Sequence, residues 1–353
     1  MIRVAVVGCG YWGPQHIRNF SASGRARVVL AVDLNPERLA HIAGRYPEVR
    51  TTCTAAAALD DGVDAVVIAT PAGTHYPLAR AALLAGKHVL VEKPLTTRAE
   101  HARELVHLAE ARGLTLMTGH TFMYHPAVRA LAGLIRSGEL GDIFYISSTR
   151  VNLGLHRKDV DVLWDLAAHD ISILRFLLGA QPRVGSVYGA AFHDPAVAEV
   201  AFAELRYPGG VLANVHVSWL DPVKIRRMTV VGSRKMAVWD DVEPHDKLRI
   251  HDKGVAHAPY YDDFGQWQVA YRYGDVHVPH IPWVEPLRAE CDHFLDCIRD
   301  GTPPLTDGRD GLAVVETLEA CSAALVLQRP PPAEAAVSPA TGRPAPAPPA
   351  PSP

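Results

Sequence analysis

Val4-Ala5-Val6-Val7 runs directly into Gly8-Cys9-Gly10-Tyr11-Trp12-Gly13, and a second apolar run, Val28 to Val32, ends at Asp33. The order is a strand, a glycine turn, a helix and a second strand that ends in a carboxylate, which is typical of a dinucleotide-binding turn. The first glycine permits the tight turn, the second lets the backbone approach a pyrophosphate, and the third lets the helix pack close to the strand. The N–H groups at the helix N-terminus would then face the phosphates.

Asp33 indicates which dinucleotide the turn would hold. A carboxylate here accepts hydrogen bonds from ribose hydroxyls and repels the 2′-phosphate of NADP, so the sequence favours NAD over NADP. Arg38 is close by, but we expect it on the next helix, facing water. The candidate cofactor contacts in this segment are Gly8, Gly10, Tyr11, Trp12, Gly13, Asp33, Asn35 and Arg38.

Size and composition narrow the class of protein. A chain of 353 residues with 48% hydrophobic content can bury a large core and should divide into two domains. The net charge of −3 and the lack of a basic run argue against nucleic acid or an anionic membrane as partners. The five cysteines form no C-x-x-C pair, which argues against a disulfide framework or structural zinc and favours a cytoplasmic location. The first apolar run reads as a core strand, so neither a signal peptide nor a membrane span is expected.

The first 120 residues alternate between strand and helix patterns. After the first strand and helix we expect strands at 27–33, 65–69, 87–91 and 115–118, with helices at 37–45, 74–85 and 98–112. Such alternation builds a parallel sheet with right-handed crossovers. We therefore predict a Rossmann domain over residues 1–120.

Beyond residue 120, apolar and polar residues alternate with the period of two that is typical of strands. After a helix at 127–137 we expect strands at 143–151, 199–207, 211–219, 226–231, 235–239 and 247–252, and closing helices at 286–299 and 312–327. The prediction is a second α/β domain over residues 121–328, built on a large, open, antiparallel or mixed sheet. Its uncovered face should pack against another subunit, giving a homodimer or homotetramer. Residues 329–353 are rich in proline and alanine and should form a disordered tail.

One further motif is the apolar strand Val89-Leu90-Val91, which ends in Glu92-Lys93-Pro94. In an open α/β sheet the carboxyl ends of the strands border the ligand crevice, which places Lys93 at the cofactor. Pro94 is a candidate for a cis peptide bond that fixes the direction of the lysine. The alternative is an exposed ion pair at a strand end.

A second motif is Trp164-Asp165-Leu166-Ala167-Ala168-His169. Asp165 and His169 are four residues apart on a predicted helix, so they share a face and the carboxylate can orient the imidazole. A histidine suits the transfer of a hydroxyl proton during hydride transfer, and a nearby lysine can polarise the same oxygen. The alternative is a surface ion pair, because the chain has 18 histidines. These histidines show no metal-ligand spacing, so no metal site is predicted.

Taken in order, four motifs resemble the Gfo/Idh/MocA oxidoreductases: Gly8-x-Gly10-x-x-Gly13, Ala69-Thr70-Pro71-x-x-x-His75, Glu92-Lys93-Pro94 and Asp165-x-x-x-His169. The resemblance covers roughly residues 1–328. It implies a Rossmann domain, a C-terminal α/β domain whose open sheet serves oligomerisation, and hydride exchange between nicotinamide and a sugar or cyclitol carbon. It also implies that Lys93 is the catalytic lysine, His169 the acid/base and Asp165 its partner. The residues that would line the cofactor cleft are Thr70, Pro71, His75, Glu92 and His120.

The resemblance does not identify the substrate. Residues 119–126 follow a Rossmann strand and should border the substrate pocket, although we expect Phe122 and Met123 to serve packing. The candidate substrate contacts are Lys93, Tyr124, Arg150, Asn152, Trp164, Asp165 and His169.

The sequence thus predicts an NAD-dependent dehydrogenase that oxidises a secondary hydroxyl of a sugar, glycoside or cyclitol to a ketone. One alternative is a ketoreductase acting on a 3-keto nucleotide sugar. Others are an NAD-dependent glycosidase that oxidises C3 transiently, and a non-enzymatic protein that senses NAD.

Overall fold

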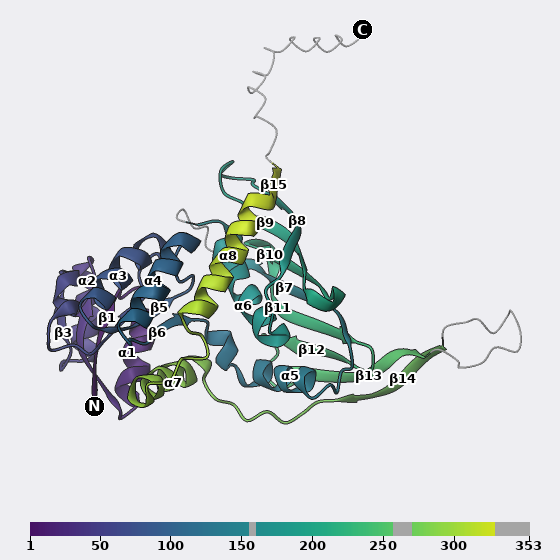
Figure 1. Cartoon of the computed structure of the whole chain (residues 1–353), viewed down its shortest axis with the longest axis horizontal. Helices are drawn as coiled ribbons and strands as arrows, with labels where there is room; N and C mark the ends of the chain where they lie inside the picture. The colour runs from purple at the N-terminus through teal and green to yellow at the C-terminus, as the bar shows by residue number, and fades with distance from the viewer. Residues whose placement is uncertain (155–159, 257–269, 329–353) are drawn as a thin grey trace, which may run out of the picture.

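The computed structural model describes residues 1–154, 160–256 and 270–328, so the predicted tail at 329–353 lies outside the described residues. Two sheets organise the described chain (Figure 1). The first has six strands in the order β3-β2-β1-β4-β5-β6, and every pairing in it is parallel. Its strands are β1 (Ile2–Val7), β2 (Ala26–Val32), β3 (Arg50–Thr52), β4 (Ala65–Ile68), β5 (His88–Glu92) and β6 (Leu116–Gly119). The predicted parallel Rossmann sheet is confirmed.

The helices between these strands are α1 (Gly13–Ala22), α2 (Pro36–Arg45), α3 (His75–Leu84) and α4 (Ala99–Ala111), with short helical turns at Ala55–Leu59 and Ala72–Thr74. Strands β4 and β5 are apolar on both faces, because helices cover the sheet on both sides. The helices on the two faces leave the carboxyl ends of the strands uncovered.

The second sheet has nine strands in the order β14-β13-β12-β11-β7-β10-β9-β8-β15. They are β7 (Ile143–Leu153), β8 (Arg183–Ala190), β9 (Val200–Arg206), β10 (Leu212–Ser218), β11 (Leu220–Gly232), β12 (Met236–Asp240), β13 (Leu248–Ala256), β14 (Ala270–His277) and β15 (Leu325–Gln328). The sheet is mixed, because β10 pairs with β7 and β15 with β8 in parallel while the other pairings are antiparallel. The sequence did not predict β8, β14 or β15.

The prediction of a helix as far as residue 327 is wrong. Helix α8 (Gly308–Ala324) ends earlier, and residues 325–328 form β15 on the edge of β8. Leu325 and Leu327 are half-buried while Val326 is exposed, so the segment has the period of a strand. The free edge of β8 offers backbone partners that the sequence pattern alone does not reveal.

Helices from the end of the chain lie between the two sheets. Helix α7 (Pro286–Asp300) packs on α1, and α8 packs on α4, on β8 and on α6 (Ala168–Leu178). The remaining helical elements are α5 (Pro126–Arg136), a π-helical turn at Leu163–Ala167, and 3₁₀ turns at Thr121–Tyr124 and Pro208–Gly210. Trp164 and Asp165 of the π-helical turn thereby reach the carboxyl ends of the Rossmann strands.

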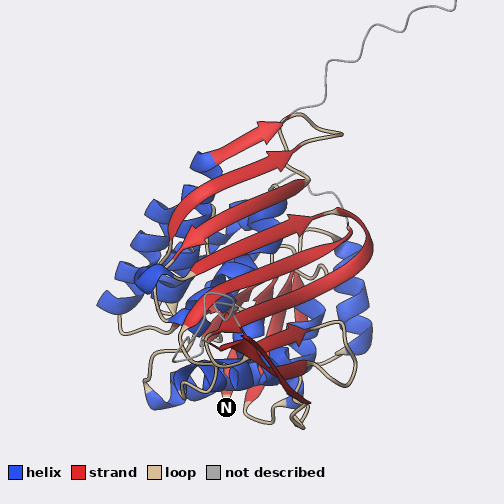
Figure 2. Ribbon diagram, turned by 90° about the vertical axis from the view of Figure 1, so that its right-hand side faces the viewer, coloured by secondary structure: helices blue, strands red, loops and turns tan. Residues whose placement is uncertain are grey.

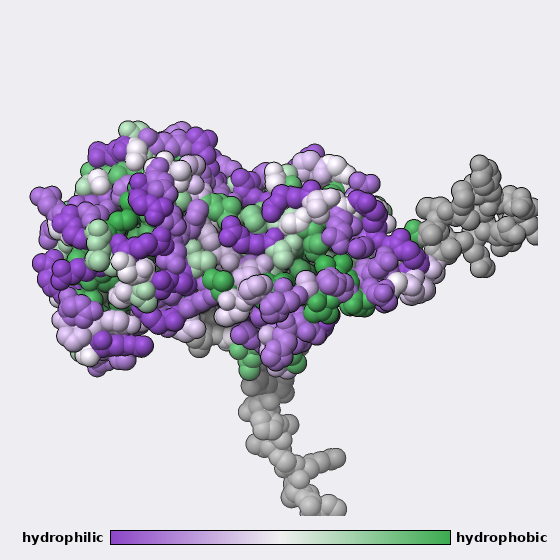
Figure 3. Space-filling view, turned by 90° about the horizontal axis from the view of Figure 1, so that it is seen from below, coloured by the Kyte–Doolittle hydropathy of each residue, from purple (hydrophilic) through white to green (hydrophobic). Residues whose placement is uncertain are grey.

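No helix of the described residues covers the other face of the nine-stranded sheet. Figure 2 shows the strands facing the viewer with the helices behind them. Large apolar side chains are exposed on these strands, among them Tyr145, Tyr188, Phe202, Leu212 and Val326. Figure 3 shows apolar side chains gathered at the end of the molecule that the sheet occupies. No helix in the described residues is both long enough and apolar enough to cross a membrane.

Candidate active site

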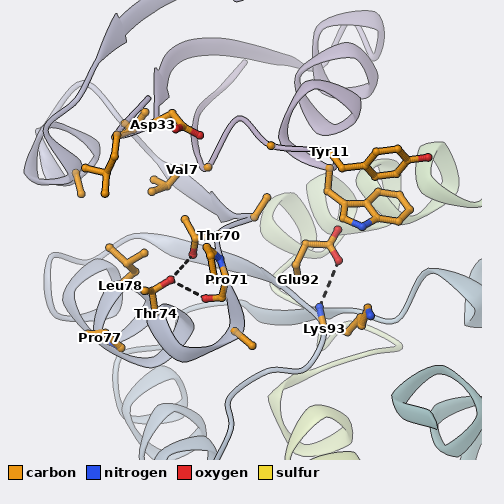
Figure 4. A pocket seen from close by; sticks show the side chains of 18 of the residues that line it. Val7, Tyr11, Asp33, Thr70, Pro71, Thr74, Pro77, Leu78, Glu92 and Lys93 are labelled. Carbon is orange, nitrogen blue, oxygen red and sulfur yellow. Dashed lines mark hydrogen bonds between the residues drawn. The ribbon is translucent and has the colours of Figure 1, made fainter. Parts of the chain in front are cut away.

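A cleft of about 770 Å³ follows the carboxyl ends of β1, β2, β4 and β5. Figure 4 shows Asp33 near one end of it and Lys93 near the other, with Thr70 and Pro71 between them. The predicted cofactor residues that line the cleft are Gly8, Gly10, Tyr11, Trp12, Asp33, Arg38, Thr70, Pro71, Glu92 and Lys93. Trp164 and Asp165 reach the same cleft from the second half of the chain.

The glycine turn fits a dinucleotide phosphate. Gly8 has a φ of +95°, and a Cβ there would lie 2.5 Å from the carbonyl oxygen of Ala69. At Gly13 a Cβ would lie 1.9 Å from the carbonyl oxygen of Gly8, so the helix can approach the strand only without a side chain. At Gly10 the nearest atom is Arg38 Nη1 at 3.8 Å, which leaves open space on the cleft side. The turn thus has the geometry expected of a phosphate cradle.

Asp33 is held firmly at the tip of β2. Its Oδ2 accepts a hydrogen bond from the Cys9 N–H at 2.6 Å, and its Oδ1 accepts one from the Asn35 N–H at 2.8 Å. Arg38 lies on α2 with a 54% exposed side chain, as expected, and it also lines the cleft, where its Nη1 lies 3.5 Å from Asp33 Oδ2. Asn35 does not line the cleft; its side chain caps α2 by accepting from the Glu37 N–H.

His75 lies beneath the cleft, whereas Glu92 lines it. His75 is buried below the cleft, and its ring nitrogens lie 2.7 Å from the Pro94 carbonyl oxygen and 2.9 Å from that of Thr70. Burial lowers the pKa of His75. Glu92 lines the cleft, and its Oε1 lies 2.8 Å from Nε2 of the fully buried His16. Sequence reasoning missed His16; its place one turn beyond Gly13 on the first helix was the available signal.

Lys93 is joined to Asp165. Its Nζ donates to the backbone carbonyl of Asp165 at 2.6 Å and to Oδ1 at 3.2 Å. The peptide bond between Lys93 and Pro94 is cis, as predicted. Asp165 Oδ2 accepts a hydrogen bond from Trp219 Nε1 at 3.1 Å, a contact that the sequence did not indicate. The ammonium group is therefore fixed at the cleft by a residue from the other half of the chain.

His169 lies beside this pair. Its ring packs edge-on against Phe122, with ring centroids 5.0 Å apart. Burial lowers the pKa of His169 well below its ordinary value, and the nearby charges of Lys93, Arg150 and Arg226 lower it further. The imidazole is thus neutral at physiological pH and able to accept a proton.

The predicted arrangement, in which Asp165 orients His169, differs from the structure. Among the described residues no hydrogen bond joins the two side chains, and Nδ1 of His169 is buried without a hydrogen-bond partner. Asp165 lies within the π-helical turn, whose wider spacing departs from the α-helical four-residue repeat. Its carboxylate faces Lys93 and Trp219 instead.

The structure does not bring all of the other candidate substrate residues to the cleft, because Tyr124 and Arg150 are buried and do not line it. Tyr124 is buried, with its hydroxyl 3.2 Å from Thr306 Oγ1, and Arg150 is buried against Asp170. Trp164 lines the cleft, and Asn152 is partly exposed near the end of β7.

His120, expected in the cofactor cleft, is fully buried and pairs with Asp310 at 2.9 Å. Phe122 and Met123 serve packing, as predicted. No group of three or more potential metal ligands is found in the described part of the chain.

Comparison with known proteins identifies the family. Residues 2–120 match the family described as "Oxidoreductase family, NAD-binding Rossmann fold", and residues 128–238 match the "GFO/IDH/MocA C-terminal domain". The chain belongs to the Gfo/Idh/MocA oxidoreductases. This oxidoreductase is therefore an enzyme with an NAD-binding Rossmann fold.

Individual relatives of this oxidoreductase share nearly its whole length. It is 32% identical over 319 residues to a UDP-N-acetylglucosamine 3-dehydrogenase of Acidithiobacillus ferrooxidans, covering 89% of this chain and 94% of the relative. It is 26% identical over 331 residues to an inositol 2-dehydrogenase of Rhizobium meliloti, covering 90% of this chain and 95% of the relative. The solved structure of GenD2 from gentamicin A biosynthesis, in complex with NAD, has a TM-score of 0.76 at 27% identity and covers 92% of this chain and 93% of its own.

Proposed function

We propose that this oxidoreductase oxidises a secondary hydroxyl of a sugar, glycoside or cyclitol to a ketone, with NAD as the hydride acceptor. The observation that carries the proposal is the Lys93 ammonium, held at the cleft by Asp165 beside a neutral His169. The relatives named as sugar and cyclitol dehydrogenases support this class of substrate.

The proposed chemistry divides between two side chains. Bound NAD supplies the nicotinamide that accepts a hydride. The Lys93 ammonium donates a hydrogen bond to the substrate oxygen and stabilises negative charge that develops on it. The neutral His169 accepts the hydroxyl proton. Asp165 positions Lys93 by accepting a hydrogen bond from its Nζ, and Trp219 helps to fix Asp165 by donating to the same carboxylate.

Oxidation and reduction would use His169 in different protonation states. A ketoreductase acting on a 3-keto nucleotide sugar would use the same residues with His169 as a general acid. Burial lowers the pKa of His169, so the imidazole is neutral before substrate binds, which is the form that oxidation requires.

The test is a substrate screen that follows the absorbance of reduced nicotinamide. Free sugars, inositols, aminoglycosides and nucleotide sugars are supplied with NAD, and 3-keto sugars with NADH. Reduction of NAD by at least one hydroxyl compound is expected. Turnover in the reverse direction alone would support the ketoreductase. Release of an aglycone without added cofactor would support the glycosidase, and NAD binding without any turnover would support a regulatory protein.

We also propose a cytoplasmic homodimer or homotetramer, with residues 1–120 as the cofactor domain and 121–328 as the substrate and oligomerisation domain. The uncovered sheet face with exposed Tyr188, Phe202 and Leu212 supports the oligomer, since a second copy would remove these side chains from water. A monomer by light scattering at micromolar concentration would contradict it.

A further inference from the structure

Two arginines lie next to each other beside His169. Arg150 on β7 and Arg226 on β11 are directly paired across the strands, so both side chains point to the same face of the sheet. They approach Phe122, with guanidinium carbons 4.5 Å and 6.0 Å from the centre of its ring. Phe122 in turn packs against the imidazole of His169. The two guanidinium groups therefore border the region where a substrate oxygen would meet His169.

Both guanidinium groups keep hydrogen-bond donors without a protein partner. Arg150 is 2% exposed and uses Nε and Nη2 on Asp170, which leaves Nη1 buried without a hydrogen-bond partner. Arg226 is bonded through Nη1 to Asp241 at 3.3 Å, while its Nε and Nη2 make no hydrogen bond with any described residue. A buried polar group without a partner is costly, so the unpaired Nη1 of Arg150 beside the reaction site indicates a place for a ligand oxygen, and the partly exposed Arg226 offers further donors next to it.

The two guanidinium groups carry like charges that an anion could bridge. Like charges directly opposite each other on neighbouring strands repel. Asp170 and Asp241 each neutralise one arginine, and Asp165 neutralises the nearby Lys93. Among the described residues Asp241 is the carboxylate that pairs with Arg226, and the Arg226 side chain is 34% exposed against 2% for Arg150, so its positive charge is the more accessible of the two. An oxyanion between the two groups would relieve the repulsion and use the free donors.

We propose that Arg226, with Arg150, binds an oxyanion of the substrate, so that this enzyme acts on an anionic sugar in preference to a neutral polyol. The inference rests on the proposed function and names the substrate class of the same site. Carboxylates and phosphates present oxygens that match the fork of a guanidinium group. The oxyanion is therefore either the carboxylate of a sugar acid or a phosphate of a nucleotide sugar.

The test compares Arg226→Gln with Arg227→Gln. Arg227 is the next residue, is exposed on the opposite face and pairs with Asp240 at 2.8 Å, so its replacement removes the same charge away from the site. The holoenzyme receives two matched substrate pairs: UDP-N-acetylglucosamine with N-acetylglucosamine, and galacturonate with galactose. Steady-state kinetics are combined with calorimetric titration of the same compounds.

Wild-type enzyme should prefer the anionic member of at least one pair, and the preferred pair identifies the oxyanion as phosphate or carboxylate. Arg226→Gln should lower kcat/KM for that anion by about 10- to 100-fold, mainly through KM, the range expected for a lost charge-assisted hydrogen bond. The neutral partner should change by less than about twofold, which is within the range of surface substitutions. Arg227→Gln should resemble wild type, and Arg226→Lys should recover only part of the loss because it lacks the fork.

Two results would overturn the inference: preference of the wild type for the neutral member of both pairs, or an equal loss by Arg226→Gln on both members of the preferred pair. Absence of turnover on all four compounds would leave the proposed function to the wider substrate screen, and calorimetry would then decide the inference. In that case, binding of the anion by the wild type that is lost in Arg226→Gln would still establish the site. Failure of the wild type to bind either anion would refute it.

Discussion

Replacement of Asp33 should change the choice between NAD and NADP. The carboxylate is 9% exposed and is fixed by hydrogen bonds from the Cys9 and Asn35 N–H groups, so it cannot turn away from a 2′-phosphate. At about 5 Å and an effective dielectric constant of about 20, two unit charges repel by about 3 kcal/mol. Arg38, 3.5 Å from Asp33, attracts the phosphate and offsets part of this repulsion. A net 1–3 kcal/mol corresponds to a preference for NAD of about 5- to 150-fold.

Two substitutions separate the charge from the hydrogen bonds. Asp33→Asn removes the charge and keeps an oxygen that can accept from the Cys9 N–H. Asp33→Ser also removes the charge but shortens the side chain, leaving that buried N–H without its acceptor, at a cost of about 1–3 kcal/mol in stability. Both should narrow the preference for NAD, and Asp33→Asn should do so with less loss of thermal stability.

Fluorescence titration with NADH and NADPH measures the two affinities, with Trp12 in the cleft as a nearby reporter. Arg38→Gln in the Asp33→Asn background should weaken NADPH binding again, since the freed guanidinium would otherwise pair with the phosphate. Equal or stronger binding of NADPH by the wild type, or an unchanged ratio in Asp33→Asn, would refute the electrostatic reasoning.

Three other predictions concern catalysis and the cofactor turn. His169→Ala should reduce turnover by about 10²–10⁴-fold with little change in NAD affinity. The double variant with Lys93→Ala should lose less turnover than the product of the losses in the two single variants. Near wild-type turnover in His169→Ala would contradict the assignment. The kcat for oxidation should stay level as the pH falls through 6.5, because the pKa of His169 is lowered and its imidazole remains unprotonated there; a pH profile that falls near 6.5 would disagree. Gly13→Ala should lower both the melting temperature and the NAD affinity, since the added Cβ would lie 1.9 Å from the Gly8 carbonyl oxygen. Gly44→Ala on α2 serves as the control, because a Cβ there would meet no neighbour within 4 Å.

The sequence by itself determined the Rossmann half and the cofactor turn. A strand, a turn and a helix are adjacent along the chain, so spacing alone gives Gly8 and Gly13 their steric roles. The same holds for Lys93, because the position of a residue at the carboxyl end of a parallel strand follows from the strand pattern.

Only the tertiary structure decided how the catalytic side chains are held. Asp165 is bound by Lys93, 72 residues away, and by Trp219, 54 residues away, rather than by the histidine one turn along its own helix. Arg150 and Arg226 become neighbours through the pairing of β7 with β11. Local periodicity specifies which face of an element a side chain occupies. The partner on that face depends on strand order and on packing between distant segments, which no single stretch of sequence contains.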